Sequence, residues 1–240
     1  MVVPFVEDAR VVGKKLAERL KQPVPIDNMP GASAQIGAQF VVKTKLDGCS
    51  LFMTANTSHS ANPSLYQSWR YDPIKDYTPT TRVGELPFAL AIHPGVPVKT
   101  LKELISYGML SFATPNSTSL VASETIKRMA GIEIVGVPYK ASLQAMTDLV
   151  GGQVQMYVAD FGSGMTMFKT DRVRVLGVTT AESTWLLPDV PPIGKTVAGF
   201  HLISWSGIFG PAGLPKPVVE RLSTEVLAVL AEKEVQDKLA

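Results

Sequence analysis

The sequence predicts an α/β protein made of two lobes that are joined by two crossing segments. Strand-like and helix-like segments alternate along its 240 residues, the alternation restarts near residue 110, and an extended run near residue 204 precedes the last helical segment. Alternation of this kind is typical of mainly parallel sheets that helices cover on both faces. The hydrophobic fraction of 45% suits the packed cores that two such lobes need.

The first series of segments contains four extended runs and two helices. Apolar runs predict extended structure over residues 2–5, 23–26, 50–54 and 88–92. Apolar residues at helical spacing predict helices over residues 11–20 and 31–43. Thr100 with Glu103 three positions later has the pattern of a capping box, so a further helix is expected to begin there.

The second series repeats this alternation. Strands are predicted over residues 110–113, 132–137, 154–158 and 173–178, and helices over residues 119–130 and 142–150. Gly131 stands where a helix C-terminus favours glycine. An extended run over residues 203–209 then leads to a long amphipathic helix over residues 217–240, which has a proline in its first turn.

The restart of the pattern predicts where the chain passes between the lobes. We expect crossings at residues 95–99 and 197–204, which form a hinge because the chain passes twice. The first lobe then comprises residues 1–95 and 204–240, with the C-terminal helix packed on it, and the second lobe comprises residues 96–203.

Composition and charge exclude several classes of protein. No apolar run approaches the roughly 18 residues of a membrane span. The 23 basic and 21 acidic residues are well mixed and give a net charge of +2. Without a basic cluster, neither nucleic acid nor a membrane surface is an expected partner.

Catalytic patterns are weak. The three histidines, His59, His93 and His201, lack the spacing of paired metal ligands, and no Walker loop or G-x-G-x-x-G motif is present. Cys49 follows a turn-forming Asp47-Gly48 pair, which favours a small, partly buried side chain over a catalytic thiol. We therefore expect no enzyme activity and no cofactor. The alternative is a small α/β enzyme, a hydrolase or transferase, that acts on a carboxylated substrate.

Two polar clusters follow strands, the position at which open α/β sheets bind ligands. One spans residues 54–60, and the other spans residues 114–119 and leads directly into a helix. A helix N-terminus offers unpaired amides and partial positive charge, and hydroxyls around it add neutral donors, so such a site receives an anion without Arg or Lys. The same residue types also form ordinary N-caps and turns, and that alternative stays open.

Three more side chains follow strands in the second series. Tyr139 and Lys140 come at the end of a strand, either as an aromatic wall and a cation that face a ligand or as an exposed turn. Asp160 either accepts a hydrogen bond from a ligand or caps the turn after it.

Eleven short segments along nearly the whole chain occur in the order of a known family. They are VVPF (2–5), LAERL (16–20), NMPGA (28–32), IGA (36–38), DG (47–48), NPSLY (62–66), YDPIKD (71–76), VPYK (137–140), GGQV (151–154), LPDVP (187–191) and PAGLP (211–215). With them the chain resembles the periplasmic solute-binding proteins of tripartite tricarboxylate transporters, known as the Bug family in Bordetella.

The resemblance implies a two-lobed, periplasmic-binding-protein-like (Venus-flytrap) fold with two crossover segments and no cofactor. It implies a monomeric protein that captures a small carboxylate in the cleft between its lobes and delivers it to membrane transporter subunits; a sensor as the partner is the alternative. It also implies a secreted precursor and a periplasmic location, with the signal peptide trimmed ahead of Met1. Di- and tricarboxylates, acidic amino acids and aromatic acids are the candidate ligands.

Family ligand contacts fall on the segments identified above. The expected ligand-binding residues are Phe5, Thr54, Asn56, Thr57, Ser58, His59, Thr114, Asn116, Ser117, Thr118, Ser119, Tyr139, Lys140 and Asp160. Two expected loops depart from the family: residues 6–10 replace a longer glycine-rich loop, and residues 106–109 replace a longer connection. Either both loops are shortened, or the recorded chain omits residues there.

Overall fold

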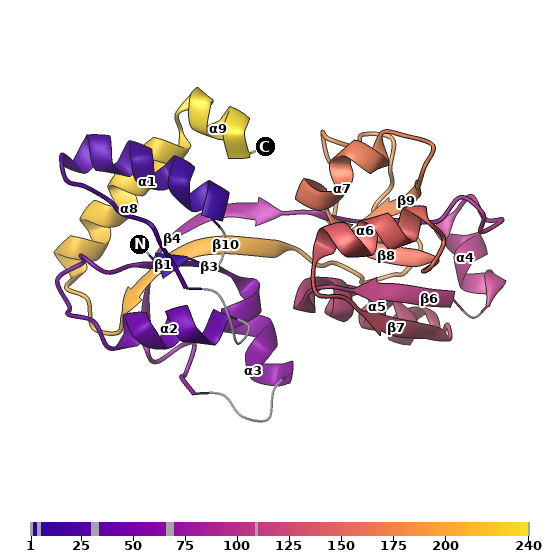
Figure 1. Ribbon diagram of the computed structural model, residues 1–240, viewed down its shortest axis with the longest axis horizontal. Coiled ribbons are helices and arrows are strands. Elements are labelled where there is room, and N and C mark those ends of the chain that lie inside the picture. Colours follow the sequence, from indigo (N-terminus) through magenta and orange to yellow (C-terminus); the bar gives the residue numbers. More distant parts are fainter. Residues whose placement is uncertain (1, 4–5, 30–33, 66–69, 109, 240) are drawn as a thin grey trace. The chain divides into compact units, whose positions relative to one another are not determined.

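The chain folds into two compact α/β units in the computed structural model, which describes all residues except 1, 4–5, 30–33, 66–69, 109 and 240 (Figure 1). Unit 1 comprises Met1–Glu85 and Trp205–Ala240, and unit 2 comprises Leu86–Ser204. Each unit is built on one five-stranded sheet. The two-lobed α/β fold with two crossings therefore agrees with the sequence prediction.

Unit 1 contains a mixed sheet with the strand order β2-β1-β3-β10-β4. Its strands are β1 (Val2–Val3), β2 (Asp27–Asn28), β3 (Phe52–Ala55), β4 (Tyr77–Leu86) and β10 (Ser204–Pro211). β1 runs parallel to β2 and β3, whereas β10 runs antiparallel to β3. The sheet is mixed rather than purely parallel, because β10 brings the chain back into unit 1 against the direction of β3.

Helices cover both faces of this sheet. The helices of unit 1 are α1 (Val6–Leu20), α2 (Gln35–Val42), α3 (Asn62–Leu65), α8 (Lys216–Leu230) and α9 (Lys233–Leu239), with a π-helical turn, η2 (Thr57–Ala61), before α3. Met53 of β3 packs with α1 and α8 on one face, and its neighbour Phe52 packs with α2 on the other. This alternation follows from the two-residue period of a strand.

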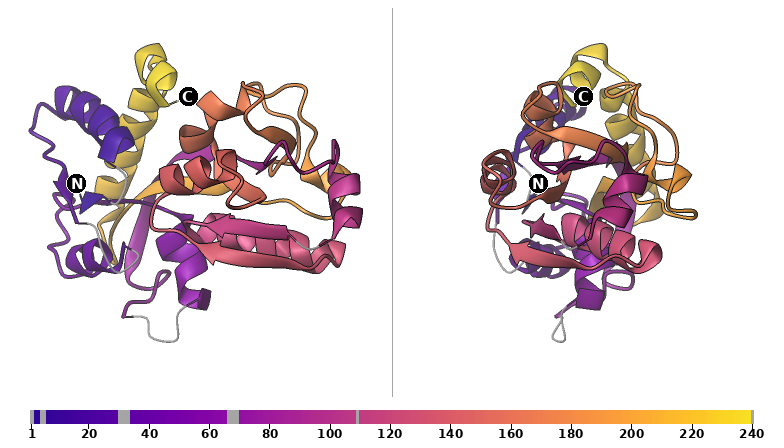
Figure 2. Two further views of the ribbon diagram at one scale, coloured as in Figure 1. Left: turned by 45° about the vertical axis from the view of Figure 1, so that its right-hand side comes forward. Right: turned by 90° about the vertical axis from the view of Figure 1, so that its right-hand side faces the viewer.

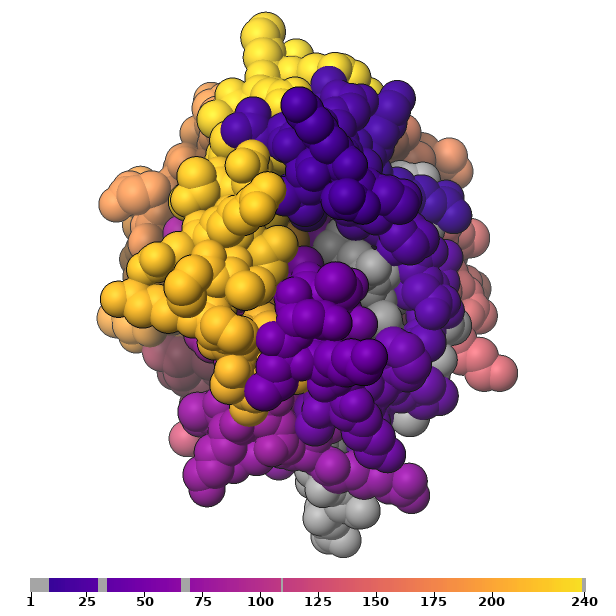
Figure 3. All heavy atoms as spheres, turned by 90° about the vertical axis from the view of Figure 1, so that its left-hand side faces the viewer, coloured from indigo at the N-terminus to yellow at the C-terminus, as the bar shows by residue number. Residues whose placement is uncertain are grey.

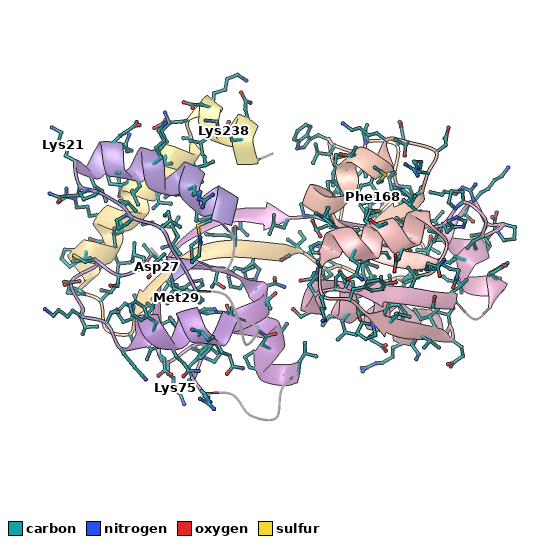
Figure 4. The ribbon with its side chains drawn as sticks, in the orientation of Figure 1. Lys21, Asp27, Met29, Lys75, Phe168 and Lys238 are labelled. Atoms are coloured by element: carbon teal, nitrogen blue, oxygen red, sulfur yellow. The ribbon has the colours of Figure 1, made fainter. Side chains whose placement is uncertain are left out.

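The C-terminal helices lie against the N-terminal one, as Figure 3 shows for the yellow and indigo segments. Arg19 of α1 pairs with Glu225 of α8 at 2.7 Å, and Lys15 pairs with Glu234 of α9 at 2.8 Å. Lys238, labelled in Figure 4, pairs with Glu234 at 2.7 Å. The predicted packing of the C-terminal helix on the first lobe is therefore observed.

Unit 2 contains the sheet with the order β7-β6-β8-β5-β9. Its strands are β5 (Phe88–Ile92), β6 (Leu110–Thr114), β7 (Ile134–Pro138), β8 (Met156–Asp160) and β9 (Arg174–Val178). β6 runs parallel to both β7 and β8, while β5 runs antiparallel to β8 and β9. The carboxyl ends of β6, β7 and β8 consequently lie at one edge of the sheet, which we call the carboxyl edge.

Helices lie on both faces of the unit 2 sheet (Figures 1 and 2). A hydrophobic core is packed on each face. The helices of unit 2 are α4 (Leu101–Tyr107), α5 (Ser117–Ala130), α6 (Ser142–Val150) and α7 (Phe161–Phe168), and a 3-10 turn, η3, spans Ile193–Lys195. In β8, Met156 and Val158 pack with α4 and α5, whereas Tyr157 and Ala159 pack with α6 and α7. Both faces of β8 are therefore buried.

The first crossing lies earlier than the sequence predicts. It falls between Glu85 and Leu86 rather than at residues 95–99, because β5 pairs with β8 and β9 and so belongs to unit 2. The strand β4 leads to this crossing and was not predicted, since its threonines, proline and glycine resemble a loop. Proline is tolerated there because β4 is an edge strand.

Three helical predictions also need correction. Residues 6–10, expected as a loop, are helical, since α1 begins at Val6. Residues 162–164, expected as a turn, lie within α7, which Asp160 caps. The predicted C-terminal helix is interrupted: α8 ends at Leu230 and α9 begins at Lys233.

Candidate functional site

The N-terminus of α5 is the centre of the candidate site in unit 2. β6 ends at Thr114, and Asn116 caps the helix in an extended conformation. Its Oδ1 accepts hydrogen bonds from the Ser119 amide at 2.9 Å and from the Ser119 hydroxyl at 3.1 Å. Asn116 and Ser119 thus hold the first turn rigid and satisfy one of its unpaired amides.

Thr118 is the first-turn residue that is left available. Its side chain is buried, with 4% exposure, yet its hydroxyl makes no hydrogen bond to a described residue. The amide of Thr118 also has no carbonyl partner within the helix, as for any residue of a first turn. Together with the helix dipole, these two donors favour an anion.

Thr114 and Tyr139 connect β6 to the segment after β7. The Thr114 hydroxyl donates to the Val137 carbonyl at 3.2 Å, and the Tyr139 amide donates to the Thr114 carbonyl at 3.4 Å. The Tyr139 hydroxyl donates to Asp148 Oδ2 at 2.9 Å. Burial and this carboxylate raise the pKa of Tyr139, so the phenol stays protonated and the ring is fixed. The neighbouring Lys140 is exposed.

Asp160 caps α7, which was one of its two predicted roles. Its Oδ1 accepts from the Ser163 amide at 2.7 Å, and its Oδ2 accepts from the Ser163 hydroxyl at 2.8 Å. Because β6, β7 and β8 are parallel, Asp160, Thr114, Asn116 and Tyr139 all follow strand ends at the carboxyl edge. The structure therefore brings the predicted site residues of the second lobe to one edge of one sheet.

The polar residues of the first lobe are arranged differently. Thr54 belongs to β3, and it and Ser58 are buried. The Thr54 and Ser58 hydroxyls lie 2.7 Å apart, and Ser58 Oγ also lies 2.9 Å from His59 Nδ1. Thr54 and Ser58 therefore bond to each other inside unit 1. Asn56 and Thr57 are half-buried and engaged in interactions of their own, and Phe5 lies outside the described residues.

His59 is packed into an aromatic cluster. Its ring stacks on Phe209 with the centroids 4.1 Å apart and lies 4.8 Å from Tyr77. Burial lowers the pKa of His59 to about 4, so the imidazole is neutral at pH 7. Its Nε2 is buried without a partner among the described residues. The Tyr71 hydroxyl, which the sequence did not identify, supports this turn by donating to the Ser58 carbonyl at 2.9 Å.

The described residues give little support for a catalytic site or a metal site. No cluster of three His, Cys, Asp or Glu side chains in the described part of the chain has the geometry to hold a metal ion. His93 is a turn residue whose Nδ1 accepts from the Gly95 amide at 3.1 Å. Cys49 is exposed rather than partly buried. It lies in a surface turn in which Asp47 Oδ1 accepts a hydrogen bond from the Cys49 amide at 2.9 Å. The Asp47 charge raises the pKa of the Cys49 thiol, which makes it a poor nucleophile.

Comparison with known proteins bears on the family and the fold. The family described as tripartite tricarboxylate transporter family receptor matches residues 8–240. The structure of R. palustris Rpa4515 with adipate has a TM-score of 0.87 and 31% identity, and covers 99% of this chain and 85% of that one. MatC from Rhodopseudomonas palustris with bound malate has a TM-score of 0.83 and 28% identity, over 99% and 86% of the two chains.

A third solved structure, the periplasmic binding protein BugD, has a TM-score of 0.83 and 28% identity, over 100% of this chain and 84% of that one. Among the described residues, no helix combines the length and the apolar character that crossing a bilayer requires.

Proposed function

Because the chain belongs to the tripartite tricarboxylate transporter receptor family, we propose that it binds a small dicarboxylate and presents it to the membrane subunits of such a transporter. It is a solute-binding receptor and not an enzyme, in agreement with the family that it matches and with its similarity to the periplasmic binding protein BugD. The similarity to BugD supports a periplasmic location.

The observation that carries the ligand proposal is the first turn of α5. Asn116 holds this turn, and the largely buried residue Thr118 offers a hydroxyl that makes no hydrogen bond to a described residue. A hydrogen bond from such a donor to a charged group contributes about 1.5–3 kcal/mol. Several of them offset the loss of water around a carboxylate without any cation in the site. A dicarboxylate is favoured because the related structures hold adipate and malate.

The first experiment identifies the ligand. Mass spectrometry of small molecules released from the purified protein is followed by calorimetric titration with adipate and malate, with the neutral adipamide as the matched control. We expect saturable binding of a dicarboxylate and none of adipamide, because the amide lacks the charge that the helix terminus favours. Equal binding of adipamide would contradict an anion site.

The second experiment locates the site. Thr118→Ala removes the available hydroxyl and is expected to weaken dicarboxylate binding about tenfold, as the loss of one bond to a charged group implies. Thr125→Ala makes the same change in a later turn of α5 and should leave affinity unchanged. Equal affinity of the wild type and Thr118→Ala, with both folded, places the carboxylate elsewhere. Thr57→Ala tests the predicted contribution of residues 54–59 by the same titration.

A further inference from the structure

Helix α6 begins at the carboxyl edge without a side-chain cap. Thr100, Asn116 and Asp160 each accept an amide hydrogen bond at the start of α4, α5 and α7. The N-cap of α6 is Ala141, which is extended and has no side chain to accept such a bond. The first-turn amides of this nine-residue helix therefore depend on another acceptor.

A hydroxyl stands at this uncapped terminus. Ser142 is the first residue of α6 and is half-buried, so a ligand can reach it. Its hydroxyl makes no hydrogen bond to a described residue, in contrast to Ser119 and Ser163, whose hydroxyls donate to Asn116 and Asp160. Ser142 is therefore the first-turn serine whose proton is uncommitted.

A second, buried hydroxyl lies behind Ser142. Tyr157 sits in the central strand β8 between Ala91 and Ala113, and its side chain has 0% exposure. Its hydroxyl has no hydrogen-bond partner among the described residues. The hydroxyls of Ser142, Ser163 and Ser119 surround it closely enough to act on it, although none is in hydrogen-bond geometry with it.

The phenol of Tyr157 stays protonated, so it has a proton to donate. Burial raises its pKa, and the Ser142 hydroxyl is the strongest of the three serine hydroxyls that oppose this effect. A buried donor without an acceptor is unfavourable, so a neighbouring oxygen with free lone pairs attracts it. Ser142 Oγ is such an oxygen once its own proton is donated outward.

We propose that the N-terminus of α6 is a second carboxylate subsite, in which Ser142 is a ligand-binding residue and Tyr157 is the positioning residue behind it. When the ligand binds, the Tyr157 hydroxyl turns to donate to Ser142 Oγ, and the Ser142 hydroxyl donates to a carboxylate oxygen. A carboxylate can only accept hydrogen bonds, so it suits this direction of donation. Consecutive donors polarise one another, which strengthens the outer bond.

This inference rests on the proposed function and makes it more specific. α5 and α6 both begin at the carboxyl edge, after the adjacent parallel strands β6 and β7. With one carboxylate at each helix terminus, we expect the receptor to prefer dianions to monoanions. The ligand class is therefore a dicarboxylate, bound by neutral donors at both ends.

The test compares a dicarboxylate with the acid that lacks its second carboxylate. Adipate and hexanoate are titrated into the wild type and Ser142→Ala by calorimetry, with malate and 3-hydroxybutyrate as the second pair. Ser142→Ala should weaken dicarboxylate binding about tenfold and change binding of the monocarboxylate less than about twofold. Ser142→Thr retains the hydroxyl and should restore most of the affinity. A purely structural role would weaken both acids equally.

The role of Tyr157 is tested by coupling. Tyr157→Phe alone should weaken dicarboxylate binding about threefold without lowering the melting temperature of the free protein. Added to Ser142→Ala it should have no further effect, because it acts through Ser142. Ser123→Ala, which removes another buried hydroxyl without a partner from α5, is the control and should leave affinity unchanged. Additive losses, or a melting temperature lowered by Tyr157→Phe, overturn the positioning role.

The outcomes separate the two proposals. Tight binding of monocarboxylates with no preference for dicarboxylates, or a Ser142→Ala variant that loses nothing, overturns the second subsite and leaves the receptor function intact. A wild type that binds none of the four acids overturns both.

Discussion

Two polar segments of similar composition have different roles in the two units. Residues 54–58 read Thr-Ala-Asn-Thr-Ser, and residues 114–118 read Thr-Pro-Asn-Ser-Thr. Asn116 is extended, with φ −148° and ψ 167°, and caps a helix. Asn56 is helical, with φ −49° and ψ −26°, and makes no side-chain cap. In unit 2, Asn116 caps the helix and leaves the Thr118 hydroxyl available. In unit 1, the Thr54 and Ser58 hydroxyls bond to each other.

The difference has identifiable causes. Pro115 restricts Thr114 to extended conformations, so the helix of unit 2 begins only after Asn116. In unit 1, Ser58 bonds to the Thr54 hydroxyl and to the Ala55 carbonyl at 3.2 Å, which closes a tight turn. His59 then enters the aromatic cluster. The composition of a polar segment therefore does not determine its role. The role depends on the contacts that the segment and the residues beside it make in the fold.

The largest expected effect concerns His59 and pH. Its pKa is about 4 in the folded protein, against an ordinary value of about 6.5. Below pH 6.5 the unfolded chain binds a proton that folded unit 1 excludes until the pH approaches 4. The free energy of unfolding should therefore fall by about 3 kcal/mol over this range, and by about 2 kcal/mol between pH 7 and pH 5. Urea unfolding at pH 7, 6 and 5 measures it.

Two variants sharpen this prediction. His59→Phe retains an aromatic ring beside Phe209 but cannot titrate, so most of the pH dependence above pH 5 should disappear. His201→Gln changes an exposed histidine, and this variant should retain the pH dependence of the wild type. An unchanged pH slope in His59→Phe would falsify the assignment.

The next largest effect is the loss of stability when a buried, hydrogen-bonded hydroxyl is removed, compared with an exposed one. Ser58→Ala leaves the buried Thr54 hydroxyl without its partner at 2.7 Å, so the free energy of unfolding should fall by about 2 kcal/mol. Ser60→Ala, at an exposed position in the same turn, should change it by less than about 0.5 kcal/mol. Equal unfolding midpoints in urea for the two variants would show that the Thr54–Ser58 bond contributes nothing.

A smaller effect distinguishes two caps within unit 2. Asn116→Ala and Thr100→Ala each remove an N-cap, and each should lower the free energy of unfolding by about 1 kcal/mol. Of the two, only Asn116→Ala should also weaken dicarboxylate binding, because α5, unlike α4, is proposed to hold the ligand. Thermal unfolding and calorimetric titration of both variants check this. The idea fails if both variants bind alike.

The smallest effect is expected at Lys140. This side chain is exposed, and exposed charges are screened by water and salt. Lys140→Ala should weaken dicarboxylate binding by no more than about threefold, and stability should change by less than about 0.5 kcal/mol. Titration at two salt concentrations checks it. A tenfold loss would mean that Lys140 reaches the carboxylate directly.

Much of unit 2 could be predicted from the sequence. The bounds of α6 and β5 agree with the predicted ranges, and Gly131 ends α5 at φ 66° as expected. Thr100 and Glu103 also behave as predicted: the Thr100 hydroxyl accepts the Glu103 amide at 3.2 Å. These features depend on interactions between residues a few positions apart, so the local sequence is enough to predict them.

Features that depend on distant partners were missed. β4 is a strand because β10 pairs with it, although its own composition resembles a loop. Ser142 and Tyr157 were read as the start of a helix and the inside of a strand, which they are, and neither position marks a binding residue by itself. The sign to look for is the absence of a cap at Ala141, which gains meaning only when a buried hydroxyl lies behind it.

The sequence by itself determined the two-lobed α/β class, the family resemblance and the polar segments after the strands, because strand alternation, helical spacing and capping are local and repeat along the chain. Only the tertiary structure decided that Thr54 and Ser58 face inward and that Asn116, Tyr139 and Asp160 share one edge of a sheet. The physical reason is that a hydroxyl or carboxylate bonds to whichever partner the fold brings within about 3 Å. That partner comes from another part of the chain.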